Sequence, residues 1–557
     1  MIHLGDDRYH TVRIGLHAWV LLSGLAAPSV GHADDCAEEL LFHHGLGGPM
    51  EKITKYFRTT EGGSLRRVTE AGQTRTTQGC IRFDAGTDRP ALLYQWFLSR
   101  TRIVPGGRYR ISIWARGRGR LEVGHTRHAL SCRYREVPGG PALGRGTYAP
   151  SVALGDKWQR FTQDFTAGEA GEALLGVRFR LPARSTAYLD GLSVTRLHDP
   201  RFTLTISPHH PMLTPGRPAE LTVHLHRDGA PVTAADLVAS GPDAPPQETA
   251  VRRLRTDEVG TVSLMFTPTE DGCRAFTFAH PDSGVMRPAY VDVVDEQTRR
   301  AFADAAGRLT LTLPAHFLFL GDSLTDMLRG HNYVDKLRFW LEGRFSQKVS
   351  FKNAAVGGDT ITRIVRRMAG NMSQYERDKY PQWHDLFSPR PQWVFLFVGA
   401  NDSKLLGAGD WKEAMVPPAA FEEQLRAAVS KIKEHAAPRL VLLSTAAGVY
   451  EKTKARVDDR LKRRQKANLF CKPEMLEAYN AILQRVAREA GADYLDIYTP
   501  TRTHPNQAAL FQADGIHLSE AGNRLVALEI LRFLASRPAR PSSAPSTQTH
   551  RPDGVPQ

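Results

Sequence analysis

The chain has 557 residues, which is too long for one ordinary domain at roughly 100–200 residues per domain. Its apolar fraction of 41% and charged fraction of 24% are close to globular averages. They exclude a wholly disordered chain, a collagen-like fibre and a polytopic membrane protein. The net charge of +14 is compatible with nucleic acid, an anionic surface or an acidic polymer as a partner. No nucleic-acid-binding module accompanies this charge, so we expect no nucleic-acid partner.

The N-terminus has the order of a secretory signal. Basic residues precede an apolar stretch at 14–27, and the small residues Gly31 and Ala33 follow. This stretch is too short for a membrane span. We therefore expect a signal peptide over 1–33, a secreted or periplasmic protein and no integral membrane span. Two aspartates interrupt the basic region, and a translation start near Val12 would remove them. A buried N-terminal helix is the alternative.

The five cysteines are too few for a scaffold built on disulfides, and their odd number prevents complete pairing within one chain. No close C-x-x-C pair is present, so we expect neither zinc-ribbon nor thioredoxin-like chemistry. If the chain is exported, Cys80 and Cys132 are the pair that we expect to form a disulfide.

Residues 34–198 are predicted to form a β-sandwich, because apolar and polar residues alternate in short runs separated by Gly, Pro and Asp. Three of these runs, at 114–117, 158–161 and 188–194, resemble strands of jelly-roll carbohydrate-binding modules. The resemblance implies sugar binding by this domain. A structural spacer or docking domain is the alternative.

Residues 199–297 contain further strand-like runs separated by Pro-rich turns. About 100 residues of short strands with turn signals indicate an immunoglobulin-like β-sandwich. No group of residues in this part suggests chemistry, so we expect a spacer.

From about residue 298 to 537 the pattern changes to α/β. Short apolar strands alternating with amphipathic helices predict a parallel sheet covered on both faces. The predicted strands lie at 316–320, 349–352, 393–398, 440–444 and 494–497. The predicted helices lie at 333–345, 359–370, 419–435, 473–490 and 519–535. The last segment, 538–557, is rich in Pro, Ser, Thr and Arg and is expected to be disordered.

Four short motifs follow these strands. Ser323 stands in a G-D-S-L motif after the first strand, and small residues end the second strand at 353–360. Asn401 follows the third strand, and Asp514 and His517 follow the fifth. Active sites of such folds lie at the carboxyl ends of the strands. A carboxylate three residues before a histidine can hold Nδ1–H while Nε2 faces a nucleophile.

Together these motifs resemble the SGNH (GDSL) hydrolase family, whose members include esterases, lipases, thioesterases and polysaccharide deacetylases. The resemblance covers about 300–537 and implies a flavodoxin-like sheet. Carried over by motif, Ser323 is the nucleophile and an oxyanion donor through its N–H, and Gly358 and Asn401 are the other oxyanion donors. His517 is the general base and then the general acid, oriented by Asp514. This route needs no cofactor and no metal.

Three further residues lie near the predicted site. Gly357 stands beside Gly358, so a shift of the backbone donor by one residue stays open. Asp326 and Asp402 are interpreted as capping or loop-positioning residues, because neither has a histidine partner of its own.

Two inserts bear on the substrate. The segment 371–392 contains the aromatic residues Tyr375, Tyr380 and Trp383, which could stack on sugar rings. The segment 446–472 contains a basic run, which is either a solvated helix face or a binding surface for an acidic polymer. Neither insert has the long apolar helix of a lipase lid.

The sequence therefore predicts a secreted, multidomain serine esterase that removes O-acyl groups, acetyl above all, from a carbohydrate. The expected partner is an acylated carbohydrate or another small ester, with an anionic polysaccharide as a further candidate. A lipolytic esterase or thioesterase is the competing enzyme, and a noncatalytic glycan-binding protein is the alternative of another class.

Overall fold

The computed structural model describes residues 37–537, except for segments 47–48, 61, 71, 77–78, 96–101, 129–145, 169–172, 242–249, 437–438 and 466. The expected signal peptide and the C-terminal tail lie outside the described residues. Among the helices that the structure describes, none is long and apolar enough to cross a membrane.

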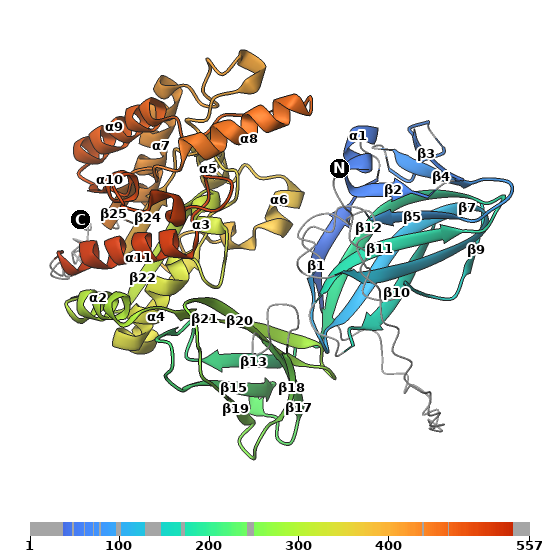
Figure 1. Ribbon diagram of the computed structural model, residues 1–557, viewed down its shortest axis with the longest axis horizontal. Helices are drawn as coiled ribbons and strands as arrows, with labels where there is room; N and C mark the ends of the chain where they lie inside the picture. The colour runs from blue at the N-terminus through green and yellow to red at the C-terminus, as the bar shows by residue number, and fades with distance from the viewer. Residues whose placement is uncertain are drawn as a thin grey trace, which may run out of the picture.

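Residues 37–198, the first β-region, form a 12-stranded antiparallel sheet around one hydrophobic core, with the short helix α1 (Met50–Tyr56) beside it (Figure 1). The strands are β1 (Ala37–His44), β2 (Phe57–Thr59), β3 (Gly63–Val68), β4 (Cys80–Ala85), β5 (Ala91–Gln95), β6 (Arg102–Ile103), β7 (Arg108–His128), β8 (Thr147–Tyr148), β9 (Val152–Leu154), β10 (Gln159–Thr166), β11 (Ala173–Leu181) and β12 (Thr186–His198).

The long strand β7 organises this region. Its first part, 108–118, pairs with β12, and its last part, 122–128, pairs with β11. Alternate side chains, such as Tyr109, Ile111 and Ile113, are buried, as period-two alternation requires. The predicted β-rich character is therefore confirmed, whereas the carbohydrate-binding assignment stays a prediction.

The expected Cys80–Cys132 disulfide is wrong, because Cys80 is a free, buried cysteine. Its thiol donates a hydrogen bond to the Gln73 carbonyl, and burial raises its pKa to about 11. Cys132 itself lies outside the described residues.

The second β-region, residues 202–293, has a four-stranded and a five-stranded sheet around its own core. Its strands are β13 (Phe202–Ser207), β14 (Met212–Leu213), β15 (Ala219–Arg227), β16 (Ala230–Pro231), β17 (Asp236–Gly241), β18 (Ala250–Arg255), β19 (Thr261–Phe266), β20 (Gly272–His280) and β21 (Val285–Val293). Two sheets over a common core fit a β-sandwich, and the immunoglobulin-like assignment stays a prediction.

The C-terminal region contains a five-stranded parallel sheet in the order β23-β22-β24-β25-β26. Numbered within the sheet, this order is 2-1-3-4-5, the flavodoxin-like order that the family resemblance implies. The strands are β22 (Ala315–Gly321), β23 (Val349–Asn353), β24 (Trp393–Phe397), β25 (Arg439–Leu443) and β26 (Asp493–Leu495). All five predicted strands are present, with ends that differ by a residue or two.

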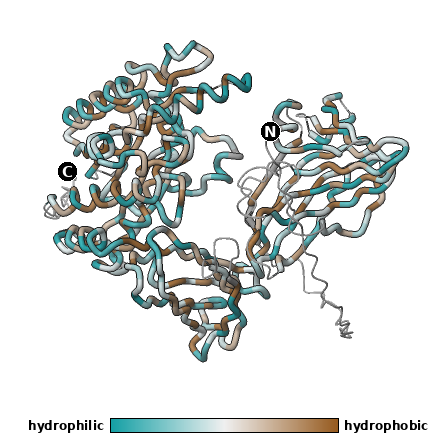
Figure 2. The backbone as a smooth tube through the Cα atoms, in the orientation of Figure 1, coloured by the Kyte–Doolittle hydropathy of each residue, from teal (hydrophilic) through white to brown (hydrophobic). Residues whose placement is uncertain are grey.

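Helices cover both faces of this sheet. The helices of this region are α2 (Glu296–Gly307), α3 (Ser323–Asp326), α4 (Tyr333–Phe345), α5 (Ile361–Met368), α6 (Gln374–Lys379), α7 (Pro418–Ala436), α8 (Tyr450–Lys462), α9 (Pro473–Ala490), α10 (Tyr498–Arg502) and α11 (Glu520–Ala535). Apolar residues of α2, α4 and α11 pack on one face, and those of α5, α7 and α9 pack on the other. Figure 2 shows brown, hydrophobic strands inside and a largely teal α8 outside.

The expected boundary between residues 297 and 298 falls inside α2, which begins at Glu296 and packs in the α/β core. The second β-region is joined to that core by a buried ion-pair cluster. Asp292 on β21 pairs with Lys336 on α4 and with Arg524 on α11, both at 2.6 Å. Such pairs are strongly destabilising to break, because the remaining charge stays buried. The second β-region is thus tied to the two helices that cover one face of the sheet.

Candidate active site

Ser323 lies where β22 ends and the short helix α3 begins. The preceding residue, Asp322, is buried and caps this helix by accepting a hydrogen bond from the Leu324 N–H at 2.9 Å. The cap fixes the turn and leaves the Ser323 side chain partly exposed at the edge of the sheet. Burial raises the pKa of Asp322 to about 6.

The structure brings Ser323, His517 and Asp514 into one hydrogen-bonded series. His517 Nε2 lies 2.9 Å from Ser323 Oγ, and His517 Nδ1 lies 2.6 Å from Asp514 Oδ2. The other carboxylate oxygen of Asp514 accepts the N–H groups of Ile516 and His517 at 2.9 and 3.0 Å. Burial opposes ionisation of Asp514, but these hydrogen bonds outweigh it and hold its pKa well below the usual range. The ionised carboxylate can therefore orient the imidazole.

The loop after β23 contains the predicted backbone donor and lies next to Ser323, since a Cβ built on Gly357 would be 3.8 Å from Ser323 Cβ. The Gly357 N–H donates to Asp326 Oδ2 at 2.8 Å, so Gly357 is not free to bind an oxyanion. No hydrogen bond among the described residues engages the N–H of Ser323 or of Gly358. Gly358 has φ of +83°, a left-handed conformation that favours glycine. Of the two adjacent glycines, only Gly358 thus has an N–H without a partner among the described residues, and its role as an oxyanion donor stays a prediction.

Asn401 follows β24 and is buried, with its amide held at both ends. Its Nδ2 donates to Asp322 Oδ2 at 3.1 Å, and its Oδ1 accepts from Lys404 Nζ at 3.4 Å. An amide nitrogen carries two hydrogens, so one remains for an oxyanion. Asp322 has a role that sequence reasoning missed, since it holds both the Ser323 turn and the Asn401 amide. Its place in the G-D-S-L motif was the available signal.

The two other acidic residues hold loops, as interpreted from the sequence. Asp402 accepts the N–H of Ile361 at 2.8 Å and that of Gly399 at 3.2 Å, and thus joins the start of α5 to the end of β24. Burial raises the pKa of Asp402 to about 7. Asp326 joins α3 to the loop after β23 through its contact with Gly357.

Comparison with known proteins agrees with this geometry. Residues 319–525 match the model of the GDSL-like Lipase/Acylhydrolase family. The C-terminal region is a GDSL-type hydrolase domain. A curated mouse protein, isoamyl acetate-hydrolyzing esterase 1 homolog, is 27% identical over 215 residues, which cover 35% of this chain and 81% of that protein. The chain is thus an ester-hydrolysing enzyme, which disfavours the noncatalytic alternative.

Solved structures were also matched. A lipase/acylhydrolase from Enterococcus faecalis is 19% identical, with a TM-score of 0.29, and the match covers 40% of this chain and 95% of that one. A catalytic mutant of an acetylxylan esterase from Geobacillus stearothermophilus is 20% identical, with a TM-score of 0.27 and coverage of 40% and 94%.

In the hydrolase domain, the aromatic insert differs from expectation. Trp383 is 5% exposed and belongs to the core, and Arg367 stacks on the rings of both Trp383 and Tyr380. The side chain of Tyr375 lies outside the described residues. The expectation that Trp383 stacks on a sugar is therefore wrong, because its ring already covers a buried guanidinium.

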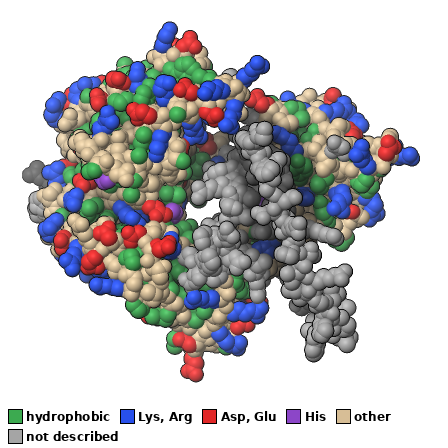
Figure 3. All heavy atoms as spheres, in the orientation of Figure 1, with side chains coloured by type: hydrophobic (Ala, Val, Ile, Leu, Met, Phe, Trp, Pro, Cys, Tyr) green, Lys and Arg blue, Asp and Glu red, His purple; other side chains and the backbone are tan. Residues whose placement is uncertain are grey.

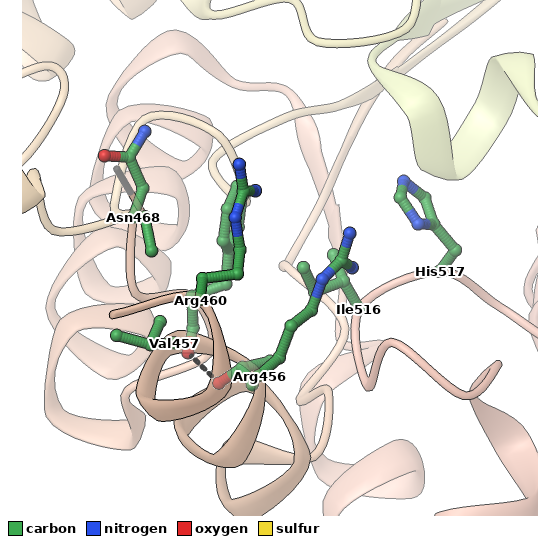
Figure 4. A pocket seen from close by; sticks show the side chains of 9 residues that line it. Arg456, Val457, Arg460, Asn468, Ile516 and His517 are labelled. Atoms are coloured by element: carbon green, nitrogen blue, oxygen red, sulfur yellow. Dashed lines mark hydrogen bonds between the residues drawn. The ribbon is translucent and has the colours of Figure 1, made fainter. Parts of the chain in front are cut away.

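The basic insert forms α8, which lines a pocket beside His517. The pocket has a volume of about 370 Å³, within the usual range for small-molecule sites. Its described lining residues are Thr453, Arg456, Val457, Arg460, Ala467, Asn468, Phe470, Ile516 and His517. In the close-up, Arg456, Arg460 and Asn468 project in the same direction as the His517 ring (Figure 4). The insert is thus a helix whose side chains partly face the site.

One further cluster in the described part of the chain has the residue types of a metal site. The side-chain ligand atoms of Cys273, His331 and Glu520 lie within 4.8 Å of one another, between β20 and the start of α11. The Cys273 N–H donates to Glu520 at 2.8 Å, and burial raises the pKa of the Cys273 thiol to about 12. The cluster contains none of the three residues of the Ser323 series.

Proposed function

We propose that this chain is an exported serine esterase that removes acetyl or similarly small acyl groups from the hydroxyls of a carbohydrate. The single observation that carries the esterase chemistry is the hydrogen-bonded series from Ser323 through His517 to Asp514. Among the described residues, no hydrogen bond engages the N–H of Ser323 or of Gly358.

In the first half of the reaction, Ser323 Oγ attacks the ester carbonyl carbon while its proton passes to His517 Nε2. The ionised Asp514 stabilises the resulting imidazolium and keeps Nε2 directed at the serine. The negative charge that develops on the carbonyl oxygen is stabilised by the N–H groups of Ser323 and Gly358 and by the remaining Asn401 amide hydrogen. Collapse of this intermediate breaks the ester bond, and His517 delivers the proton to the leaving alcohol.

In the second half, water takes the place of the alcohol. His517 Nε2 accepts a proton from the water as its oxygen attacks the acyl-Ser323 carbonyl, and the same oxyanion donors act again. The acid then leaves, and the proton on His517 returns to Ser323 Oγ. The proposed reaction thus regenerates the free enzyme.

Three observations support the finer parts of the proposal. A small acyl group is consistent with the name of the mouse relative, which refers to an acetate ester. The wall beside His517 carries two arginines, which offer hydrogen-bond donors to a polar, sugar-like alcohol component. The carbohydrate and the export rest on the resemblance of the first β-region to carbohydrate-binding modules and on the N-terminal apolar segment.

The test is acetate release from a panel of acetylated polysaccharides, with Ser323→Ala as the control. We expect release from at least one polysaccharide by the wild type and none by the variant. A parallel series of 4-nitrophenyl esters of increasing acyl length measures kcat/KM. A preference for long acyl chains over acetyl would contradict the proposal and favour a lipolytic esterase or thioesterase.

A further inference from the structure

The described residues that line the α8 pocket include basic side chains but no acidic ones. Arg456 and Arg460 both line it. The two acidic residues at the middle of α8 are engaged elsewhere, since Asp458 pairs with Lys454 at 3.0 Å and Asp459 with Arg463 at 3.1 Å. No ion pair among the described residues involves Arg460.

The two arginines differ in how their charge is used. Arg456 lies 3.7 Å from Asp514 Oδ2, the oxygen that also binds His517. Its charge is thus shared with the Asp514 carboxylate. Arg460 is exposed on the same helix, one turn further on, and has no such partner. Figure 3 shows Lys and Arg side chains projecting from the surface over α8.

A further cation, Lys404, lies next to a residue that lines the pocket. Lys404 Nζ lies over the ring of Phe470, 5.2 Å from its centroid, and Phe470 lines the pocket. The same ammonium group contacts the Asn401 amide. Positive groups therefore lie both on α8 and next to the oxyanion donor, where they can attract an anionic substrate group.

The position of the pocket indicates which part of the ester it contacts. His517 Nε2 delivers a proton to the leaving alcohol, so the alcohol component must lie beside the imidazole. The pocket is lined by His517 and by its neighbour Ile516. A group bound there thus belongs to the alcohol side of the ester.

We propose that the α8 pocket binds a carboxylate on the alcohol component of the substrate, so that the enzyme prefers an acetylated uronic acid to the corresponding neutral sugar. This inference rests on the proposed esterase function. A guanidinium presents parallel N–H donors that match the two oxygens of a carboxylate. Among the described residues no hydrogen bond or ion pair engages the Arg460 guanidinium, so Arg460 is the residue assigned to that contact.

The experiment compares two substrates that differ in one charge. An O-acetylated methyl galacturonide and its primary amide carry the acetyl group at the same position, and the ratio of their kcat/KM values measures the preference. We expect the wild type to favour the carboxylate about tenfold or more, the effect of one charge-assisted hydrogen bond. Arg460→Gln should bring the ratio close to one. Arg463→Gln, at the C-cap of α8 and outside the described pocket lining, should leave the ratio as in the wild type.

The inference and the esterase function can fail separately. If the wild type hydrolyses 4-nitrophenyl acetate but does not discriminate between the two sugars, the anionic pocket is overturned and the esterase stands. If no ester is hydrolysed, the proposed function fails, and calorimetry with Ser323→Ala then tests the pocket alone. Tighter binding of the deacetylated methyl galacturonide than of its amide, lost in Ser323→Ala/Arg460→Gln, supports the pocket, and equal affinities overturn it.

Discussion

The catalytic centre and the α8 pocket share His517, but their side chains are held in different ways. In the centre, Asp322, Asn401 and Asp514 each make hydrogen bonds that fix a neighbouring group. On α8, by contrast, Arg460 is exposed, and no ion pair among the described residues constrains it. Rigid, coupled groups suit bond breaking, whereas a mobile charged side chain suits the capture of substrates that differ in shape. We therefore expect changes in the centre to affect turnover and changes on α8 to affect selectivity.

The largest effect should come from Asp514→Asn, which tests the coupling in the centre. The asparagine keeps the size of the side chain but cannot stabilise the imidazolium and can leave the imidazole in the wrong tautomer. We expect kcat to fall by about 10⁴-fold, measured with 4-nitrophenyl acetate. Circular dichroism should show an unchanged fold. A loss of less than tenfold would mean that His517 does not depend on Asp514, and the contrast with α8 would disappear.

Asn401→Ala should have the next largest effect. Loss of one oxyanion donor lowers kcat by about 10²–10³-fold. Because buried Asp322 also loses a hydrogen bond, the variant should be less stable by about 1–3 kcal/mol, which thermal unfolding measures. The matched control is Ser403→Ala, since the buried Ser403 hydroxyl has no hydrogen-bond partner among the described residues. Near wild-type kcat in Asn401→Ala would exclude the assigned donor.

Both the sheet and the contacts within the centre could be predicted because their causes are local. Strands buried on both faces are apolar throughout, so the five parallel strands are visible as short apolar runs. Ser323 and His517 are 194 positions apart, but the carboxyl ends of parallel strands meet at one edge. Asp514 is three residues from His517, close enough for one loop to present both.

The α8 pocket and the burial of the aromatic insert could not be predicted, because they depend on contacts between distant parts of the chain. In α8 the only residues described as buried are Thr453 and Val457. The helix therefore has a weak apolar periodicity, and its sequence pattern does not distinguish a helix from a solvated loop. Trp383 is a residue type that often stacks on sugars, but here its ring is buried against Arg367. This is a tertiary contact that the neighbouring sequence does not reveal. The same holds for Asp322, whose contact with Asn401 joins two distant loops.

A smaller effect concerns pH and the stability of the centre. The pKa of Asp402 is about 7 in the folded chain, against an ordinary value of 3.8. Between about pH 4 and pH 7 Asp402 therefore binds more protons in the folded than in the unfolded chain, so its contribution to the free energy of unfolding should decrease as the pH rises. Asp402→Asn should weaken this dependence, which chemical denaturation at pH 4, 5.5 and 7 measures. Identical slopes for the two proteins would show that Asp402 stays ionised throughout.

The smallest effect is expected at the C-terminal end of α8. Arg463→Gln removes an exposed ion pair with Asp459, whose side chains are 59% and 53% exposed. Such pairs contribute about 0–1 kcal/mol, because solvent screens the charges and the long side chains lose entropy on pairing. Denaturant unfolding should therefore give a change within about 0.5 kcal/mol, and kcat should stay at the wild-type value. A larger loss of stability would mean that the charges of α8 hold the helix in place. The arginines would then serve the fold, and the distinction between a rigid centre and an adaptable wall would no longer apply.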